Sequence, residues 1–82
     1  MSVIALHTHK KTLNTLSTGC SAVVSGFQGD QCLCSRLQEL GLIEGSTICL
    51  AYRLSFGGPL AVKVKGATLA IRSEDAACVL VQ

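Results

Sequence analysis

The cysteines and histidines are the residues of this sequence that could either bind a metal ion or take part in catalysis. Two pairs have one intervening residue, His7 with His9 and Cys32 with Cys34. Zinc sites usually take four ligands from two closely spaced pairs. Side chains two apart on a helix point about 200° from each other, so Cys32 and Cys34 cannot face one metal ion if their segment is helical. We therefore expect no metal site and no cofactor. Because their number is odd and no CxxC pair occurs, we expect all the cysteines to be free thiols: Cys20, Cys32, Cys34, Cys49 and Cys78.

A catalytic centre is hard to place in this sequence. A nucleophile needs a base within reach and a third group that orients the base, but both histidines lie in an N-terminal stretch without a clear period. The neighbouring acids Glu74 and Asp75 suit the start of a short helix. Gly57-Gly58-Pro59 lacks the lysine and the following helix of a phosphate-binding loop. The sequence predicts a protein that is not an enzyme.

Charge and composition narrow the class of partner. The 82 residues carry a net charge of +2, with 15% charged and 49% hydrophobic residues. A nucleic-acid-binding domain is usually clearly basic. The chain also has only one Tyr, two Phe and no Trp on which nucleic-acid bases could stack, so we do not expect a nucleic-acid partner. With so few charges some apolar area stays outside, which favours a protein partner or a homo-oligomer. We find no membrane span or signal peptide in the sequence, so we expect no membrane insertion and a cytoplasmic location.

One helix is expected, between Asp30 and Leu42. Asp30 can act as its N-cap by accepting hydrogen bonds from the first turn. Gly41 can end it in a left-handed conformation without strain, with Leu42 folded back onto Leu37. Leucines at helical spacing predict a stripe that faces the core: Leu33, Leu37 and Leu40.

The other segments alternate with the period of strands. We expect a strand at Cys20–Phe27, one from Ser46 in which Ile48, Leu50, Tyr52 and Leu54 share a face, a hairpin at Leu60–Arg72 and a last strand at Ala77–Val81. Five short strands cannot bury two open sheets, but they can close into a barrel. The helix follows the first strand, which favours an SH3-like barrel over an OB-fold. The predicted fold is mainly β: a small SH3-like five-stranded barrel with one α-helix inserted after the first core strand. It forms a single domain of residues 12–82 after an N-terminal arm of residues 1–11.

The loop between Leu54 and Leu60 is the most suggestive candidate for partner contact. A Phe beside two glycines could anchor an interface, because the glycines let a partner's backbone approach closely. We therefore predict partner contact through Phe56, Gly57, Gly58 and Pro59. The alternative is that Phe56 folds over the end of the barrel. Lys63, Lys65 and Arg72 form either a patch for an acidic partner or an ordinary solvated face.

Four short motifs occur in order along the chain: residues 13–19, Ser35 to Ser46, Gly57-Gly58-Pro59-Leu60 and residues 66–76. Together they resemble the FeoA family, the small ferrous iron transport protein A of bacteria. The stretch from Ser35 to Ser46 is similar to its RL-x-x-LGL-x-x-G signature, and Gly57-Gly58-Pro59-Leu60 is similar to its GGP-I loop. Residues 13–19 resemble the L-x-x-L-x-x-G opening of the family, and residues 66–76 resemble its closing segment. The likeness runs from Leu13 to Val81.

The resemblance implies an SH3-like barrel and a non-enzymatic accessory or regulatory protein of ferrous iron uptake. Its partner would be the cytosolic part of a FeoB-type transporter, a membrane GTPase, reached by protein–protein contact. Arg36 is then a candidate partner-binding residue that could act as an arginine finger, unless it pairs with Asp30 or Glu39 on the helix surface. Two other functions stay open. One is a metal-sensing or metal-delivering module built on the Cys and His residues, and the other is an SH3-like adaptor with an unrelated partner.

Overall fold

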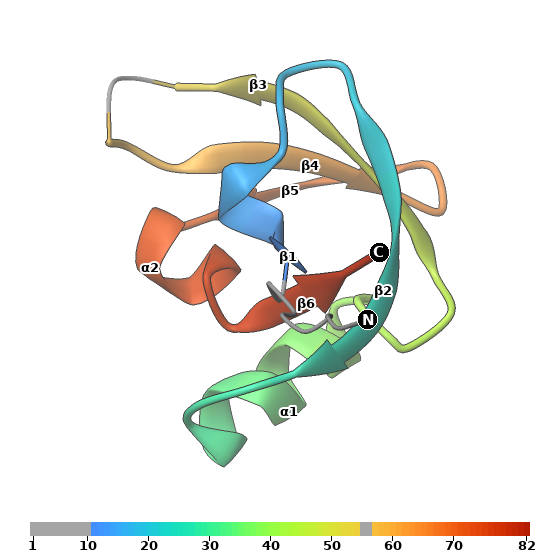
Figure 1. Cartoon of the computed structure of the whole chain (residues 1–82), viewed down its shortest axis with the longest axis vertical. Coiled ribbons are helices and arrows are strands. Elements are labelled where there is room, and N and C mark those ends of the chain that lie inside the picture. Colours follow the sequence, from blue (N-terminus) through green and yellow to red (C-terminus); the bar gives the residue numbers. More distant parts are fainter. Residues whose placement is uncertain (1–10, 55–56) are drawn as a thin grey trace, which may run out of the picture.

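Antiparallel strands dominate the computed structural model, which describes residues 11–54 and 57–82. Along the sheet the strand order is β1-β6-β2-β3-β4-β5. The strands are β1 (Lys11–Thr12), β2 (Ser21–Phe27), β3 (Thr47–Arg53), β4 (Leu60–Val64), β5 (Ala67–Ile71) and β6 (Val79–Val81). The helices are the 3-10 helix η2 (Leu13–Thr15), α1 (Gln31–Glu39) and α2 (Ser73–Ala76). Figure 1 shows that α1 lies at one end of the long axis and the turn between β3 and β4 at the other.

The expected mainly β architecture is confirmed, with α1 between β2 and β3. One strand is additional. The two-residue β1 pairs with β6, with Lys11 opposite Val81 and Thr12 opposite Leu80, so the described residues form a sheet of six strands where five were expected. Lys11 therefore pairs with the barrel although we assigned it to the arm. In the described residues no helix is long and apolar enough to cross a bilayer.

The interior is filled by aliphatic side chains from every part of the fold. Leu13 and Leu42 are fully buried although neither lies on a strand, so η2 and the segment after α1 belong to the core. The buried cluster comprises Leu13, Leu16, Val24, Leu37, Leu42, Ile48, Leu50, Leu60, Val62, Val64, Ile71, Ala76, Val79 and Val81. Since side chains fill a barrel this small, a partner must bind its outer surface.

Both ends of α1 form as its sequence predicts. Asp30 Oδ1 accepts hydrogen bonds from the backbone N–H groups of Cys32 (2.7 Å) and Leu33 (3.2 Å), which satisfies donors that the first helical turn leaves unpaired. Gly41 has a φ of +108°. Its N–H donates to the Gln38 carbonyl, and the N–H of Leu42 donates to the Leu37 carbonyl at 3.1 Å. This pair of bonds is a Schellman ending.

The end of β3 departs from the expected alternation. Ile48 and Leu50 are buried, but Tyr52 is 50% exposed and Leu54 is 54% exposed, so the prediction that these four residues share one face is wrong. The register shifts between Leu50 and Tyr52, which pair with Val62 and Ala61. The residue between them, Ala51, is thus an extra one, and such a bulge reverses the side-chain direction for the rest of a strand.

Candidate functional site

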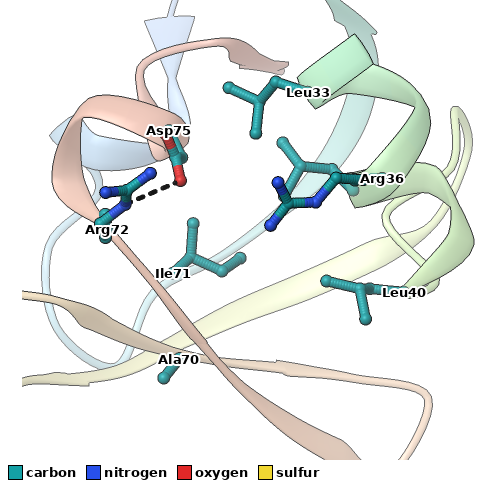
Figure 2. Close-up of a pocket in the computed structure, with 8 residues that line it drawn as sticks. Leu33, Arg36, Leu40, Ala70, Ile71, Arg72 and Asp75 are labelled. Carbon is teal, nitrogen blue, oxygen red and sulfur yellow. Dashed lines mark hydrogen bonds and ion pairs between the residues drawn. The ribbon is translucent and has the colours of Figure 1, made fainter.

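A groove opens between α1 and the segment that joins β5 to α2 (Figure 2). Its volume is about 210 Å³. We call it the α1–β5 groove. The first wall comes from α1 and its C-cap residue and consists of Leu33, Arg36, Leu37 and Leu40. The second wall comes from the end of β5 and the start of α2 and consists of Ala70, Ile71, Arg72 and Asp75.

Helical spacing places the residues of the first wall. Leu33, Leu37 and Leu40 lie on one side of α1, as their sequence positions predict. Only part of this stripe reaches the core, because Leu37 is 4% exposed whereas Leu40 is 53% exposed. The expectation that the whole stripe faces the core is therefore wrong for Leu40. Its side chain instead presents apolar surface at the open edge of the groove (Figure 2).

The second wall is held by the short helix α2. Ile71 is buried at the end of β5, and Arg72 is the N-cap residue of α2. Arg72 Nε and Asp75 Oδ2 form an ion pair at 3.3 Å, and the N–H of Asp75 donates to the Arg72 carbonyl at 3.0 Å. The Arg72 side chain is 70% exposed. Such a pair adds little to stability, but it fixes where the Asp75 charge lies.

Arg36 gives the groove a cation that has no polar partner among the described residues. Within residues 11–54 and 57–82 its guanidinium makes no ion pair or hydrogen bond, so the expected alternative of pairing with Asp30 or Glu39 is not found there. Asp30 instead caps α1. Figure 2 shows the Arg36 guanidinium pointing into the hollow. The groove therefore combines an apolar surface, the Arg72 cation paired with Asp75, and the Arg36 cation, which residues 11–54 and 57–82 leave unpaired.

The loop predicted to contact a partner lies away from this groove. Leu54 N–H donates to the Pro59 carbonyl at 2.9 Å and so closes the turn between β3 and β4. Gly57 has a φ of +74°, and a Cβ there would meet nothing within 4 Å. Phe56, the proposed anchor, lies outside the described residues. Gly57, Gly58 and Pro59 do not line the groove, and Figure 1 places their turn at the far end of the molecule from α1. The fold does not bring them together with Arg36.

Most of the second wall was not predicted from the sequence. Asp75 was interpreted as a helix-capping acid, and Arg72 was assigned to a basic face with Lys63 and Lys65. Those two lysines are exposed on the β4–β5 hairpin and do not line the groove. The spacing Arg72-x-x-Asp75 was the available signal, since residues three apart on a helical turn meet. Nothing in the sequence showed that this turn would face α1.

The cysteines do not form a recognisable metal centre in the part of the chain that the structure describes. There, no three Cys, His, Asp or Glu side chains come together as a metal site would require. All five cysteines are free, and Cys34 is the buried one. His7 and His9 lie outside the described residues.

The antiparallel sheet in the order β1-β6-β2-β3-β4-β5, the helix after its first long strand and the groove on its outside define a small SH3-like barrel protein. The family profile of the FeoA domain matches residues 11–82, and the chain belongs to the FeoA family. The expected family and SH3-like fold are thereby confirmed. No curated protein matches the sequence.

Solved structures show the same fold. FeoA of Stenotrophomonas maltophilia, in complex with zinc, is 32% identical with a TM-score of 0.79, covering 88% of this chain and 89% of that chain. It is described as a prokaryotic SH3-domain protein and a candidate activating factor of ferrous iron transport. An iron uptake regulatory protein, FeoA, is 25% identical with a TM-score of 0.79, covering 92% and 97% of the two chains. A manganese-dependent transcriptional repressor shares the fold at 21% identity and a TM-score of 0.78, over 87% of this chain and 40% of that chain.

Proposed function

We propose that this protein is a non-enzymatic accessory of bacterial ferrous iron uptake that acts in the cytoplasm. It binds the cytosolic part of a FeoB-type transporter through the α1–β5 groove. Membership of the FeoA family supports the link to ferrous iron transport. The observation that carries the choice of surface is the half-exposed Leu40 beside Arg36, whose guanidinium has no partner in the described part of the chain. Interfaces place apolar anchors and arginines at such sites.

The groove defines the chemistry of the partner segment. Covering the exposed half of the Leu40 side chain would contribute about 1 kcal/mol. A partner carboxylate beside Arg36 would form a charge-assisted hydrogen bond, whereas the charge of the adjacent Arg72 is balanced by Asp75. We infer that the partner presents an apolar side chain flanked by an acid. This contact requires no catalytic residue in the chain itself.

Arg36 could serve the partner in two ways. It could bind a carboxylate, or it could reach into the GTPase site as an arginine finger. A lysine keeps the charge but loses the planar, forked donor arrangement of the guanidinium. Arg36→Lys would therefore retain much of the binding, whereas a finger role would be lost with it. GTP hydrolysis and affinity, measured together, separate the two roles.

The turn between β3 and β4 remains a second predicted contact, through Phe56, Gly57, Gly58 and Pro59. It lies at the other end of the molecule from the groove, so one small partner segment cannot cover both. If this turn is the docking site, Phe56→Ala weakens binding by about 1–3 kcal/mol and hardly changes the melting temperature. If Phe56 instead caps the barrel, the same change costs about 3 kcal/mol or more of stability.

The experiment is a titration of the purified cytosolic domain of a FeoB-type transporter with the full chain. We expect saturable binding that weakens as salt is raised, because the groove carries net positive charge. Binding should persist in a strong chelator. Absence of binding, with the transporter domain shown to hydrolyse GTP, would contradict the proposal. Binding that requires added metal would favour the alternative of a metal-sensing or metal-delivering module.

A further inference from the structure

The loop between β2 and α1 holds two cysteines from different parts of the chain. The N–H of Gln28 donates to the Cys78 carbonyl at 2.9 Å. The carbonyl of the same residue accepts from Cys34 Sγ at 3.7 Å. Cys34 lies on α1, and Cys78 lies in the turn between α2 and β6. Gln28 thus contacts both residues, although they are far apart in the sequence.

The sulfur of Cys78 lies close to Gly29 of the same loop. A Cβ built on Gly29 would lie 3.2 Å from Cys78 Sγ, a contact so tight that a side chain there would require the sulfur to shift by a few tenths of an ångström. Cys34 Sγ contacts Gln28 and Cys78 Sγ lies against Gly29, so the two thiols approach adjacent residues. The charge of Cys34 is also among the causes that raise the pKa of Cys78, after burial, which is consistent with their proximity.

We propose that Cys34 and Cys78 are a disulfide-forming pair. Cys34 is buried at 8% exposure, whereas Cys78 is half-buried, so Cys78 is the thiol that a small oxidant reaches first. Cys32 is exposed on the same helix, but it points about 200° away from Cys34. Cys32 therefore serves as the control, because it lies on the same helix as Cys34 but its side chain is not directed toward Cys78.

The oxidant in this proposal is a low-molecular-weight disulfide such as oxidised glutathione. The Cys78 thiol loses its proton and attacks one sulfur, which forms a mixed disulfide and releases one glutathione thiolate. Cys34 then loses its proton and attacks the Cys78 sulfur, which releases the second glutathione thiolate. The two thiolates take up two protons. Two protein thiols and one glutathione disulfide thus become one protein disulfide and two reduced glutathiones.

The disulfide would link α1 to the segment after α2. These two helices contribute to the walls of the α1–β5 groove, although neither cysteine lines the groove itself. Cys34 lies on the helix that forms the first wall, and Cys78 follows the helix that carries Asp75 of the second. An effect of oxidation on transporter binding rests on the proposed function. Formation of the disulfide does not, and it is measured on the protein alone.

The experiment treats the full chain with oxidised glutathione, blocks remaining thiols with N-ethylmaleimide and determines the mass without reduction. Disulfides form only where the two Cα atoms come within about 7 Å, so the reaction itself tests the geometry. We expect a monomer in which Cys34 and Cys78 have together lost two hydrogens, while each of the other three of its five cysteines carries either a blocking group or a glutathione. Digestion should link the peptide that contains Cys34 to the one that contains Cys78.

Three variants complete the test. Cys32→Ser should form the disulfide as the unchanged chain does, whereas Cys34→Ala and Cys78→Ser should not. Alanine at position 34 keeps the buried site apolar, and circular dichroism checks that each variant folds. A disulfide that involves Cys32, a stable glutathione adduct on Cys78 in the unchanged chain, or no oxidation while exposed Cys20 is modified would each overturn the proposal.

Discussion

Arg72 and Asp75 form an ion pair of 3.3 Å at the edge of the α1–β5 groove, on the wall opposite Arg36. This pair neutralises one of the two cations of the groove and leaves the other available to a partner. Figure 2 shows the carboxylate of Asp75 turned toward Arg72. The charge that the groove presents therefore depends on a contact within its own second wall.

Asp75→Asn tests this electrostatic arrangement. Because the Arg72 side chain is 70% exposed, loss of the ion pair should change the free energy of unfolding by less than about 1 kcal/mol. The affinity for an acidic partner should rise, since two cations would then be unpaired, and it should depend more steeply on salt. Thermal unfolding and titrations at two salt concentrations measure both. Weaker binding at low salt would show that the partner uses Asp75 itself.

Gly41→Val tests the ending of α1. The φ of Gly41 is +108°, a conformation that a β-branched residue resists, so we expect a loss of about 1 kcal/mol or more of stability. Gly41→Asn is the matched control, because asparagine tolerates the left-handed region better. Chemical denaturation of the three proteins gives the comparison. Equal stability of the valine variant and the unchanged chain would rule out the Schellman ending as drawn.

Gly29→Ala and Gly19→Ala separate backbone strain from crowding. Both glycines have positive φ, +94° and +87°, but a Cβ at Gly29 would lie 3.2 Å from Cys78 Sγ, whereas one at Gly19 would meet nothing within 4 Å. Each change should cost about 1–2 kcal/mol through strain, and Gly29→Ala should cost more. Cys78→Ala should recover only the excess at Gly29. If the two alanine variants are equally stable in urea unfolding, Cys78 does not lie against the loop.

The pH dependence of alkylation at Cys78 has a defined sign. Burial is the largest cause that raises the pKa of its thiol, followed by the charges of Cys34 on α1, Asp75 on α2 and Asp30 at the start of α1. A raised pKa means less thiolate at a given pH, so iodoacetamide should react with Cys78 in the folded chain only at higher pH than in the urea-unfolded chain. Mass spectrometry of the labelled peptide follows the reaction. A folded-state midpoint at or below the unfolded one would contradict the assigned surroundings.

Much of this fold could be predicted from the sequence because several of its helix ends and turns are determined by interactions between residues close together in the chain. The cap at Asp30, the ending at Gly41 and the hairpin that turns at Gly66 each depend on neighbours a few residues away. The bulge at Ala51 was not predictable from alternation. It reverses Tyr52 outward and lets Arg53 Nη2 donate to the carbonyls of Asn14 (2.7 Å) and Leu16 (3.2 Å). That contact spans more than thirty residues of sequence.

The candidate site shows the same limit. The helical spacing placed Arg36 and the leucine stripe on α1, but it could not show that Leu40 would be half exposed, because that depends on how α1 lies against β5. The position of Asp75 in the groove could not be predicted either, because it depends on how α2 lies relative to α1. Sequence patterns assign residues to a face of an element, whereas a groove forms between two elements whose packing is set by the whole core.

The measurement that tests the central claim most directly compares Leu40→Asp with Leu54→Asp in binding to the cytosolic domain of a FeoB-type transporter. The two leucines are 53% and 54% exposed, so both changes are expected to leave the fold intact, but Leu40 lines the α1–β5 groove and Leu54 adjoins the β3–β4 turn. We predict that Leu40→Asp weakens binding at least tenfold, about 1.4 kcal/mol, while Leu54→Asp binds as the unchanged chain does. The reverse result, with Leu54→Asp defective and Leu40→Asp unaffected, would contradict the account and place the transporter on the loop.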